Sequence, residues 1–585
     1  MRIASLIILL GLAPVALAQP TFVNAVTGSE EIAVEGVAAD AAGNVYITGH
    51  FEGTVDLDPS DGPDAEDSFT AIGLRQPNAF VASYTSAGAY RWGYGFGGTT
   101  SDIGNSIATD GTRVYVVGGF RSSAGMDVEP GAGETVLTPE GGNDAFVVAY
   151  AASTGALEWA FNLGGVGADN VFDVATDGDR VYLGGVFEDP MDIDPGAGTT
   201  TLDGFTDQVN AFMAAYAADD GTFVWGHDFF GPAITQSLGI GTDGDGAYVT
   251  GSLRGTADFD PSGGTAELTG STETGGATAT EDVFVAAYDA SSGAYRWAHL
   301  ISGPNGQRGF TIDADGDQVY VGGGLAGSAD FDPGAGTATL ESSGVIKPFI
   351  AAYTASAGAY VWANLLDSTE RGSERTYGIA AIGNRVYATG AIQGTIDFDP
   401  GPGTVELTTA GFLDAFLVAY NTADGALEEA GLISGTANER AYAVAVSSTH
   451  VIVGGDFSAI SRSPVDFDTG AGMETRVSTG SFDGFLASYP VPEGVDAESS
   501  PARLASLSVY PNPGTRATVE LAVEAPASVS LTLYDALGRQ LEVLFEGEVV
   551  DAVQTQLPVG LAPGVYVVRA SSEGLAESVR VTVLR

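Results

Sequence analysis

The sequence of 585 residues lacks cysteine altogether and has a single lysine, Lys347. Without cysteine there are no disulfides, thiolate metal sites or cysteine nucleophiles. The four histidines, His50, His227, His299 and His450, are too scattered for a His-rich metal site. Basic residues are scarce, since 22 Lys and Arg face 75 Asp and Glu, which gives a formal net charge of -53. This charge argues strongly against binding to nucleic acid or to anionic lipid, because phosphates are repelled.

Long apolar runs are also missing, and the one apolar stretch that stands out lies at the N-terminus. After Met1-Arg2, residues 3–17 are apolar except for a few small breaks, and Ala16-Leu17-Ala18 fits the small-x-small cleavage rule. This pattern is typical of a secretory signal peptide. No later segment reaches the ~18 unbroken apolar residues of a membrane helix. We therefore predict a signal peptide over residues 1–18 and no transmembrane span.

Glycine, in contrast, is abundant, with 83 residues, roughly twice the usual ~7% share. This density suits many short strands joined by tight turns. Within the middle of the chain an acidic motif, acid-x-acid, recurs seven times at intervals of 65 to 72 residues. The seven pairs are Asp56 and Asp58, Asp127 and Glu129, Asp192 and Asp194, Asp258 and Asp260, Asp330 and Asp332, Asp397 and Asp399, and Asp466 and Asp468.

Two further sequence motifs, which we call markers, recur at the same intervals as the acidic motif. A Phe-x-x-x-Tyr motif recurs in all seven units, and the five tryptophans follow its tyrosine by eight or nine residues, with Glu429 in the sixth place. Each unit of about 66 residues is expected to form four strands with glycine-containing hairpin turns. Four-stranded units repeated seven times predict an all-β fold, a seven-bladed β-propeller over residues 19–490. The seventh unit lacks a fourth strand, which we expect residues 21–28 to supply because they resemble residues 159–165.

The repeats resemble a known group of sequences. Residues 40–49 read Asp-Ala-Ala-Gly-Asn-Val-Tyr-Ile-Thr-Gly, which is similar to the D-x-x-G-N-V-Y-x-T-G pattern of bacterial Gly-rich propeller repeats. The resemblance covers roughly residues 20–490. It implies the fold and says almost nothing about activity, because such scaffolds are widely reused.

The C-terminal part differs from the repeats. A polar linker over residues 491–503 leads to alternating strands over 504–585, which predict a small β-sandwich. Four motifs closely resemble the type A C-terminal sorting domain of the type IX secretion system: Val509-Tyr510-Pro511-Asn512-Pro513, residues 533–539 ending in Gly538-Arg539, residues 563–566, and the basic terminal strand 579–585.

That resemblance implies an export route. It implies Sec export to the periplasm of a Gram-negative bacterium, then passage across the outer membrane with the type IX machinery as partner. The product is expected to be extracellular or on the outer cell surface. An ordinary sandwich module that binds sugar or protein is the alternative, which explains the strands but not the motif set.

The paired carboxylates of the acidic motif have two interpretations. Residues two apart on a strand point the same way, so each pair could offer two hard oxygens to calcium. However, the spacing lacks the ladder of a calcium loop, and Asp before Pro-Gly is common in turns. Structural turns are therefore favoured over calcium, which is the only cofactor that the sequence suggests.

The second candidate site is the mouth of the predicted central channel. There the loops between the fourth strand of one unit and the first of the next vary among units, as in a site built on a rigid scaffold. We predict a non-catalytic binding or structural protein with a glycan or protein ligand; the alternative is a carbohydrate-active hydrolase or lyase at the same place, although no catalytic residue can be singled out. The candidate ligand-binding residues are Asn305, Arg308, Arg371, Glu374, Arg375, Glu439 and Arg440.

Overall fold

The computed structural model describes most of the chain after residue 18. The described residues are 19–58, 67–73, 75–129, 131, 133–204, 209–229, 234–271, 280–343, 345–368, 370, 374–458, 463–470, 472–492, 504–510, 518–523, 527–535, 539–549, 552–558, 561–572 and 575–583. Every named element in these ranges is a β-strand, so the described chain is all-β. None of the described residues forms a helix that could cross a membrane. The chain divides into two compact units, residues 1–495 and 496–585.

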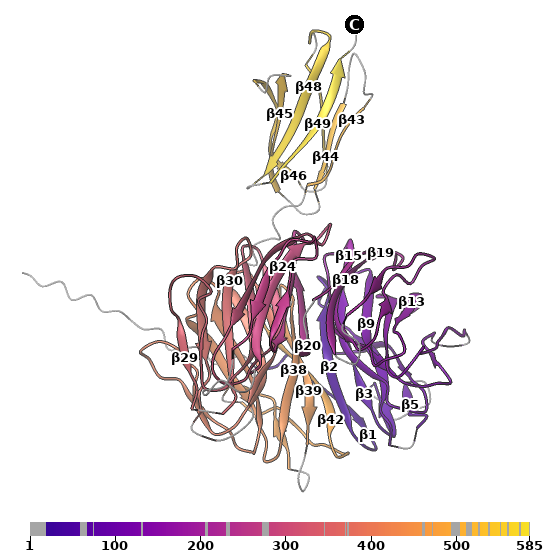
Figure 1. The fold of residues 1–585 in the computed structure, drawn as a ribbon, viewed down its shortest axis with the longest axis vertical. Helices are drawn as coiled ribbons and strands as arrows, with labels where there is room; N and C mark the ends of the chain where they lie inside the picture. The colour runs from indigo at the N-terminus through magenta and orange to yellow at the C-terminus, as the bar shows by residue number, and fades with distance from the viewer. Residues whose placement is uncertain are drawn as a thin grey trace, which may run out of the picture. The chain divides into compact units, whose positions relative to one another are not determined.

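The first unit is built from seven antiparallel sheets whose four main strands follow one another in sequence and in space, except in the last (Figure 1). Sheet 1 has β2 (Ile32–Ala39), β3 (Val45–Phe51), β6 (Asn78–Tyr84) and β7 (Tyr90–Phe96); sheet 2 has β8 (Ile103–Thr109), β9 (Arg113–Phe120), β12 (Asp144–Ala151) and β13 (Leu157–Leu163); sheet 3 has β14 (Asn170–Thr176), β15 (Arg180–Phe187), β18 (Asn210–Ala217) and β19 (Phe223–Asp228); sheet 4 has β20 (Ile234–Thr242), β21 (Gly246–Leu253), β24 (Asp282–Asp289) and β25 (Tyr295–Ile301). Sheet 5 has β26 (Gln307–Asp315), β27 (Gln318–Leu325), β30 (Lys347–Thr354) and β31 (Tyr360–Leu365); sheet 6 has β32 (Arg375–Ile382), β33 (Arg385–Ile392), β36 (Asp414–Asn421) and β37 (Leu427–Ile433); sheet 7 has β38 (Glu439–Val446), β39 (His450–Phe457), β42 (Asp483–Pro490) and β1 (Phe22–Gly28).

The first strands of the sheets pack against one another in order. β2 contacts β8, β8 contacts β14, and the series continues through β20, β26 and β32 to β38, which contacts β2 again. We call these seven the inner strands; β2, β20 and β38 lie toward the middle of the unit in Figure 1. Most inner strands carry a one-residue bulge near their start, for example between Gly309 and Thr311. A bulge re-aims the extra side chain, and this residue is important for the site described below.

The last sheet takes its fourth strand from the other end of the unit. β1 pairs antiparallel with β42, with Phe22 opposite Ser488 and Val26 opposite Gly484. Val26 is fully buried, and the Asn24 side chain donates a hydrogen bond to the Gly88 carbonyl of sheet 1 at 2.8 Å. The N-terminal strand therefore links sheet 7 to sheet 1.

A short two-stranded ribbon follows the second strand of every sheet, and its first strand ends at the first carboxylate of the acidic motif. The ribbons are β4 (Thr54–Asp56) with β5 (Ser68–Thr70), β10 (Met126–Asp127) with β11 (Val136–Leu137), β16 (Met191–Asp192) with β17 (Thr201–Leu202), β22 (Thr256–Asp258) with β23 (Glu267–Thr269), β28 (Ser328–Asp330) with β29 (Thr339–Glu341), β34 (Thr395–Asp397) with β35 (Glu406–Thr408), and β40 (Val465–Asp466) with β41 (Thr475–Arg476).

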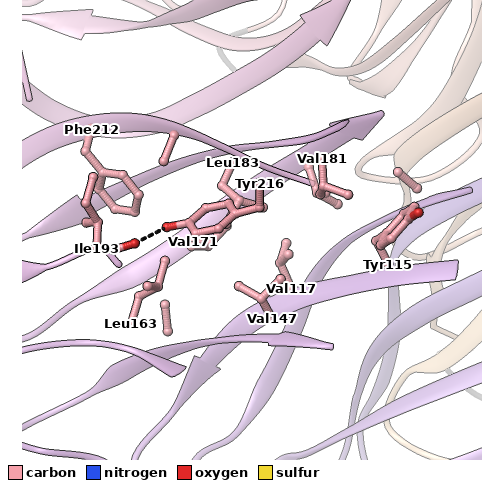
Figure 2. Packing of buried hydrophobic residues seen from close by; sticks show 14 of the residues in the cluster. Tyr115, Val117, Val147, Leu163, Val171, Val181, Leu183, Ile193, Phe212 and Tyr216 are labelled. Carbon is pink, nitrogen blue, oxygen red and sulfur yellow. Dashed lines mark hydrogen bonds between the residues drawn. The ribbon is translucent and has the colours of Figure 1, made fainter. Parts of the chain in front are cut away.

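The hydrophobic core lies between neighbouring sheets. Figure 2 shows one cluster, in which Val117 and Val147 of sheet 2 pack against Val171 and Leu183 of sheet 3. All four side chains are fully buried. Each sheet carries apolar residues on both faces, since successive residues of a strand point to opposite faces. A neighbouring sheet covers each face, and burial of this apolar area stabilises the unit.

The tryptophan marker joins one sheet to the next. Trp225 of β19 donates its indole N–H to the Ala290 carbonyl of sheet 4 at 3.0 Å. Its ring lies against Gly293, where an added Cβ would approach within 2.7 Å. Gly293 has φ +66 in the turn between the third and fourth strands, so glycine is needed there both for the conformation and for the close approach. The in-phase tryptophans therefore pack between sheets.

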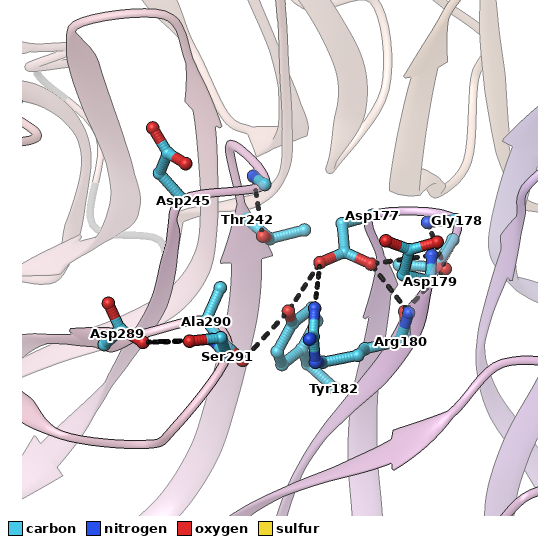
Figure 3. A network of polar contacts seen from close by, with 12 residues as sticks. Asp177, Gly178, Asp179, Arg180, Tyr182, Thr242, Asp245, Asp289, Ala290 and Ser291 are labelled. Carbon is cyan, nitrogen blue, oxygen red and sulfur yellow. Dashed lines mark hydrogen bonds and ion pairs between the residues drawn. The ribbon is translucent and has the colours of Figure 1, made fainter. Parts of the chain in front are cut away.

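Hairpin turns supply a second link between sheets, shown for sheets 3 and 4 in Figure 3. The Asp177 carboxylate accepts the backbone N–H of Arg180 at 2.7 Å and the hydroxyl of Tyr182 at 2.7 Å. Tyr182 also donates to the Ala290 carbonyl of sheet 4 at 3.3 Å. Asp177-Gly178 thus forms one of the glycine-containing hairpin turns that we expected in each unit.

The second unit has two sheets over a shared core. One sheet has the order β43 (Leu504–Tyr510), β44 (Thr518–Val523) and β47 (Ala552–Gln556); the other has β46 (Gln540–Val549), β45 (Ala527–Asp535), β48 (Gly564–Ser572) and β49 (Leu575–Val583). Leu521 of the first sheet and Leu531 and Val568 of the second belong to one cluster, and all three are fully buried.

Candidate functional site

The acidic motif forms a turn in all seven units. The first carboxylate accepts the backbone N–H of the second acidic residue, for example Asp258 from Asp260 at 3.0 Å. In six units it also accepts the N–H of the residue eight positions later, as Asp258 does from Ala266 at 2.8 Å. The same bond between the two acids closes the pairs at Asp56, Asp127, Asp192, Asp330, Asp397 and Asp466.

The marker tyrosine holds the backbone between the two acids. Tyr216 donates its hydroxyl to the Ile193 carbonyl at 2.8 Å (Figure 2), and the corresponding bond is present in all seven units. Among the described residues no group of three or more His, Asp or Glu is arranged to hold a metal ion. These bonds place the motif in a turn in which the first carboxylate is bonded to its own backbone.

Two acidic candidates from the sequence lie inside the protein. Glu374 is fully buried, and its Oε1 lies 2.9 Å from the Nζ of Lys347, which is also fully buried. Lys347 further donates to Ser368 Oγ at 2.5 Å and to the Glu370 carbonyl at 2.8 Å. Burial raises the pKa of Glu374 even though Lys347 opposes this. The lone lysine of the chain thus closes a buried ion pair between sheets 5 and 6.

Glu439 occupies the equivalent position one sheet further on, without a lysine. It is fully buried, and its Oε2 accepts the Gly435 N–H at 2.9 Å. Its Oε1 has no hydrogen-bond partner among the described residues. Burial and the nearby Asp414 carboxylate raise the pKa of Glu439 to about 8. Neither Glu374 nor Glu439 can contact a ligand in solution, which argues against the assignment of both to a ligand-binding surface.

A cavity of about 270 Å³ opens beside the starts of β26 and β32. Arg308 and Phe310 come from β26, Arg375 from β32, and Glu281 from the residue before β24. Gly306, Gly324, Ala326 and Ile346 complete the lining. Its volume lies just below the ~300–1,000 Å³ of typical ligand pockets, so it has room for one small group.

The charged groups at this cavity are mostly positive. Arg308 Nε lies 2.5 Å from Glu281 Oε2, and Arg254 Nη2 lies 3.5 Å from the other oxygen of the same carboxylate. The Arg375 guanidinium lies over the Phe310 ring, 5.1 Å from its centroid. Two arginines, Arg308 and Arg254, therefore contact the Glu281 carboxylate, and Arg375 lies over the neighbouring ring.

The pattern at this cavity repeats on the next inner strand. In β26, β32 and β38 an arginine precedes an aromatic residue by two positions, and that aromatic residue is the bulged one. The aromatic rings contact in series, with 6.0 Å between the centroids of Phe310 and Tyr377 and 5.5 Å between those of Tyr377 and Tyr442. We call these six residues the Arg–aromatic arc: Arg308 and Phe310, Arg375 and Tyr377, and Arg440 and Tyr442.

The arc ends in a cluster of titratable groups. Asp456 Oδ2 accepts the Tyr442 hydroxyl at 2.9 Å and lies 3.4 Å from Arg440 Nη1. Burial raises the pKa of Asp456 to about 7, against the opposing effect of Arg440. Next to it on sheet 1, His50 Nδ1 lies 3.3 Å from Glu35 Oε1. Burial lowers the pKa of His50, but Glu35 outweighs it and the net direction is upward.

The structure thus separates the sequence-based candidates. Arg308 and Arg375 line the cavity, and Arg440 lies at the matching position of β38. Asn305 is exposed in the loop before β26, and Arg371 lies outside the described residues. The aromatic members of the arc were missed, although the Arg-x-aromatic pattern recurs in phase at 308–310, 375–377 and 440–442 and would have indicated them.

The sorting motif lies in the second unit. Tyr510 is the last residue of β43, and Arg539 is exposed just before β46. Pro511, Asn512, Pro513 and Gly538 lie outside the described residues, as does the predicted signal peptide over 1–18. The linker 491–503 is described only at residues 491 and 492.

Comparison with known proteins gives only distant structural similarity. A scan against protein-family models found no match, and a search of curated proteins found none. The quinohemoprotein alcohol dehydrogenase from Comamonas testosteroni is 11% identical, with a TM-score of 0.36 over 84% of this chain and 78% of that chain. The phage phi92 endosialidase is 10% identical, with a TM-score of 0.33 over 90% and 74%. An ulvan lyase from a new polysaccharide lyase family is 12% identical, with a TM-score of 0.34 over 74% and 93%.

Proposed function

We propose that this protein is an exported binding protein that holds an acidic extracellular ligand in the cavity of sheets 5 and 6. The observation that carries the proposal is the lining of this cavity by Arg308, Arg375 and Phe310. Guanidinium groups bind carboxylates and sulfates through two parallel hydrogen bonds, and a ring beside them offers an apolar face to the ligand. The chain as a whole is strongly acidic, so two arginines at one cavity favour an anionic group of the ligand there.

The scaffold of this proposal is a closed seven-bladed β-propeller with a C-terminal β-sandwich. Seven sheets in sequence order, inner strands that contact in a series returning to its start, and β1 in sheet 7 all support closure. The two sheets of the second unit that share a core support the sandwich. The channel mouth of a propeller is a rigid frame on which neighbouring blades place ligand-binding side chains.

Export is proposed on the sequence alone. Residues 1–18 serve as the signal peptide, and residues 504–585 serve as the address for the type IX secretion machinery. Export predicts a mature N-terminus at Gln19, which mass spectrometry of the secreted protein would detect. Deletion of residues 504–585 should leave the protein in the periplasm of a host with this machinery; continued secretion would contradict the proposed tail.

The binding function is tested with soluble probes of known charge. Calorimetry with polygalacturonate, chondroitin sulfate, neutral pullulan and polyglutamate should show binding of an anionic probe and none of pullulan. Ala326→Trp, which fills the cavity, should abolish binding. Arg180→Ala is the matched control, because it removes one positive charge at the Asp177 turn, away from the cavity. Anionic binding that survives Ala326→Trp would refute the proposed site.

An enzyme acting at the channel mouth is the second candidate function. The observation in its favour is the Tyr442 hydroxyl, which donates to Asp456 at 2.9 Å. Asp456 is itself buried, so with its pKa near 7 it would exchange a proton with Tyr442 and not directly with the substrate. The same probes should then yield new reducing ends or unsaturated products, and Asp456→Asn should abolish their formation. If no product forms, binding alone is the function.

A further inference from the structure

The cavity is one part of a longer feature, the Arg–aromatic arc. Its three arginines occupy the same position on three consecutive inner strands, because each lies two residues before the bulged aromatic residue. β26 contacts β32, and β32 contacts β38. The Arg375 guanidinium covers the ring of the preceding strand, at 5.1 Å from Phe310. The arc therefore carries one arginine and one aromatic ring on each of three neighbouring strands, while Arg440 lies over the ring of Phe482, outside the arc, at 5.5 Å.

The arginines at the two ends of the arc have donors beyond their protein contacts. Arg308 contacts Glu281 through Nε, and Arg440 contacts Asp456 and Tyr442 through Nη1. A guanidinium has five N–H donors, so these contacts do not exhaust either group. The exposed fractions of the two side chains are 39% and 32%, which leaves both accessible from solvent.

Resting on the proposed function, we propose that the ligand is an acidic polysaccharide and that the arc binds at least three successive units of it. Each arginine takes the carboxylate or sulfate of one unit, and the rings between them take the apolar faces of the sugars. Successive rings contact one another, with centroids 6.0 and 5.5 Å apart, so the arc offers an apolar contact beside each arginine. Acidic sugar units have apolar ring faces for such contacts, which the aspartate and glutamate side chains of an acidic peptide lack.

The length of the ligand provides the test. The mature full-length protein is titrated by calorimetry with galacturonate oligomers of one, two, three and six units, and with neutral galactose oligomers of the same lengths. Affinity should rise at each step to the trimer, by about tenfold from dimer to trimer, and then level off. Neutral oligomers should not bind. Equal affinity for all acidic lengths would overturn the inference and leave the proposed cavity standing.

Two substitutions test which arginine contributes to each increase in affinity with oligomer length. Arg375→Ala should weaken binding of every acidic oligomer, while Arg440→Ala should lower trimer affinity about tenfold, to that of the dimer. Because Arg440→Ala leaves Asp456 without its cation, Arg440→Lys is the second variant; it keeps the charge and should fall between the wild type and Arg440→Ala. Arg180→Ala should bind as the wild type does.

The possible failures are distinguishable. If no acidic oligomer or polymer binds, or if Ala326→Trp leaves binding intact, the proposed function fails together with the inference. If acidic oligomers bind and Arg440→Ala does not change the trimer affinity, only the three-unit arc is overturned. If polyglutamate of matched charge binds more tightly than the galacturonate trimer, the ligand is an acidic peptide and the saccharide assignment is wrong.

Discussion

Glu439 and Glu374 occupy the same position on neighbouring sheets, and neutralising them should change stability in opposite directions. Burial and Asp414 raise the pKa of Glu439 to about 8, whereas an unfolded glutamate titrates near pH 4.3. Between these values the folded state holds a proton that the unfolded state has released, so stability falls as the pH rises through this window. At ~1.36 kcal/mol per pKa unit, the penalty reaches up to about 5 kcal/mol at pH 8.

Glu439→Gln removes this penalty while keeping an oxygen that can accept the Gly435 N–H. The variant should therefore be more stable than the wild type by several kcal/mol at pH 8, with the difference vanishing near pH 4.5. Urea unfolding at pH 4.5, 6 and 8, followed by tryptophan fluorescence, measures this difference. All five tryptophans lie within the first unit, so the signal reports on the unit that contains Glu439.

Glu374→Gln is the matched comparison. This substitution leaves the buried ammonium of Lys347 without its carboxylate, and loss of one partner from a buried ion pair costs about 3–5 kcal/mol. Glu374→Gln should therefore be less stable than the wild type at pH 8, where Glu439→Gln is more stable. If both substitutions destabilise the protein equally at pH 8, the reasoning about an uncompensated acid at Glu439 is refuted.

Three further predictions concern closure, the turn and calcium. Deletion of residues 19–28 removes β1 and should lower the melting temperature of the first unit sharply, whereas deletion of residues 504–585 should not; equal melting of all forms would show that β1 does not close the unit. Tyr216→Phe leaves the buried Ile193 carbonyl without its donor and should cost about 1–3 kcal/mol in urea unfolding, and no measurable cost would mean that this carbonyl finds water. Added calcium and chelator should leave the melting temperature unchanged, because the acidic motifs bond to their own backbone; a rise with calcium would restore the cation-site interpretation.

Much of the architecture was predictable because the sequence markers correspond to physical bonds. The marker tyrosine and the acidic motif keep the same phase because the tyrosine hydroxyl binds the carbonyl between the two acids, as in Tyr216 and Ile193. The tryptophans keep phase because each packs against the turn of the next sheet, as Trp225 does at Gly293. Contacts that recur in every unit require the same residue types at the same positions of each repeat. This periodicity in the sequence is why the all-β class could be predicted.

The site was only partly predictable, because side-chain direction depends on where a strand begins. The sequence placed residues 374, 375, 439 and 440 together in loops at the channel mouth. In the structure β32 and β38 begin there, and alternation along the chain sends the glutamates into the interior and the arginines toward solvent. The bulge then re-aims the aromatic residue two positions later. The amino-acid composition indicates neither where the strand begins nor where it bulges. The Arg-x-aromatic pattern, which recurs in phase with the repeats, does indicate these positions.

The single lysine can now be understood from its position. Lys347 is the first residue of β30, and the first residue of the third strand is a buried Asn or Asp in every other sheet: Asn78, Asp144, Asn210, Asp282, Asp414 and Asp483. At the next junction, Asp414 lies near Glu439 and raises its pKa, whereas Lys347 bonds to Glu374. At the first of these two junctions between sheets, Lys347 therefore neutralises the buried glutamate, whereas at the second an aspartate lies beside it. The Lys347–Glu374 pair holds the start of β32, where Arg375 forms the middle of the arc.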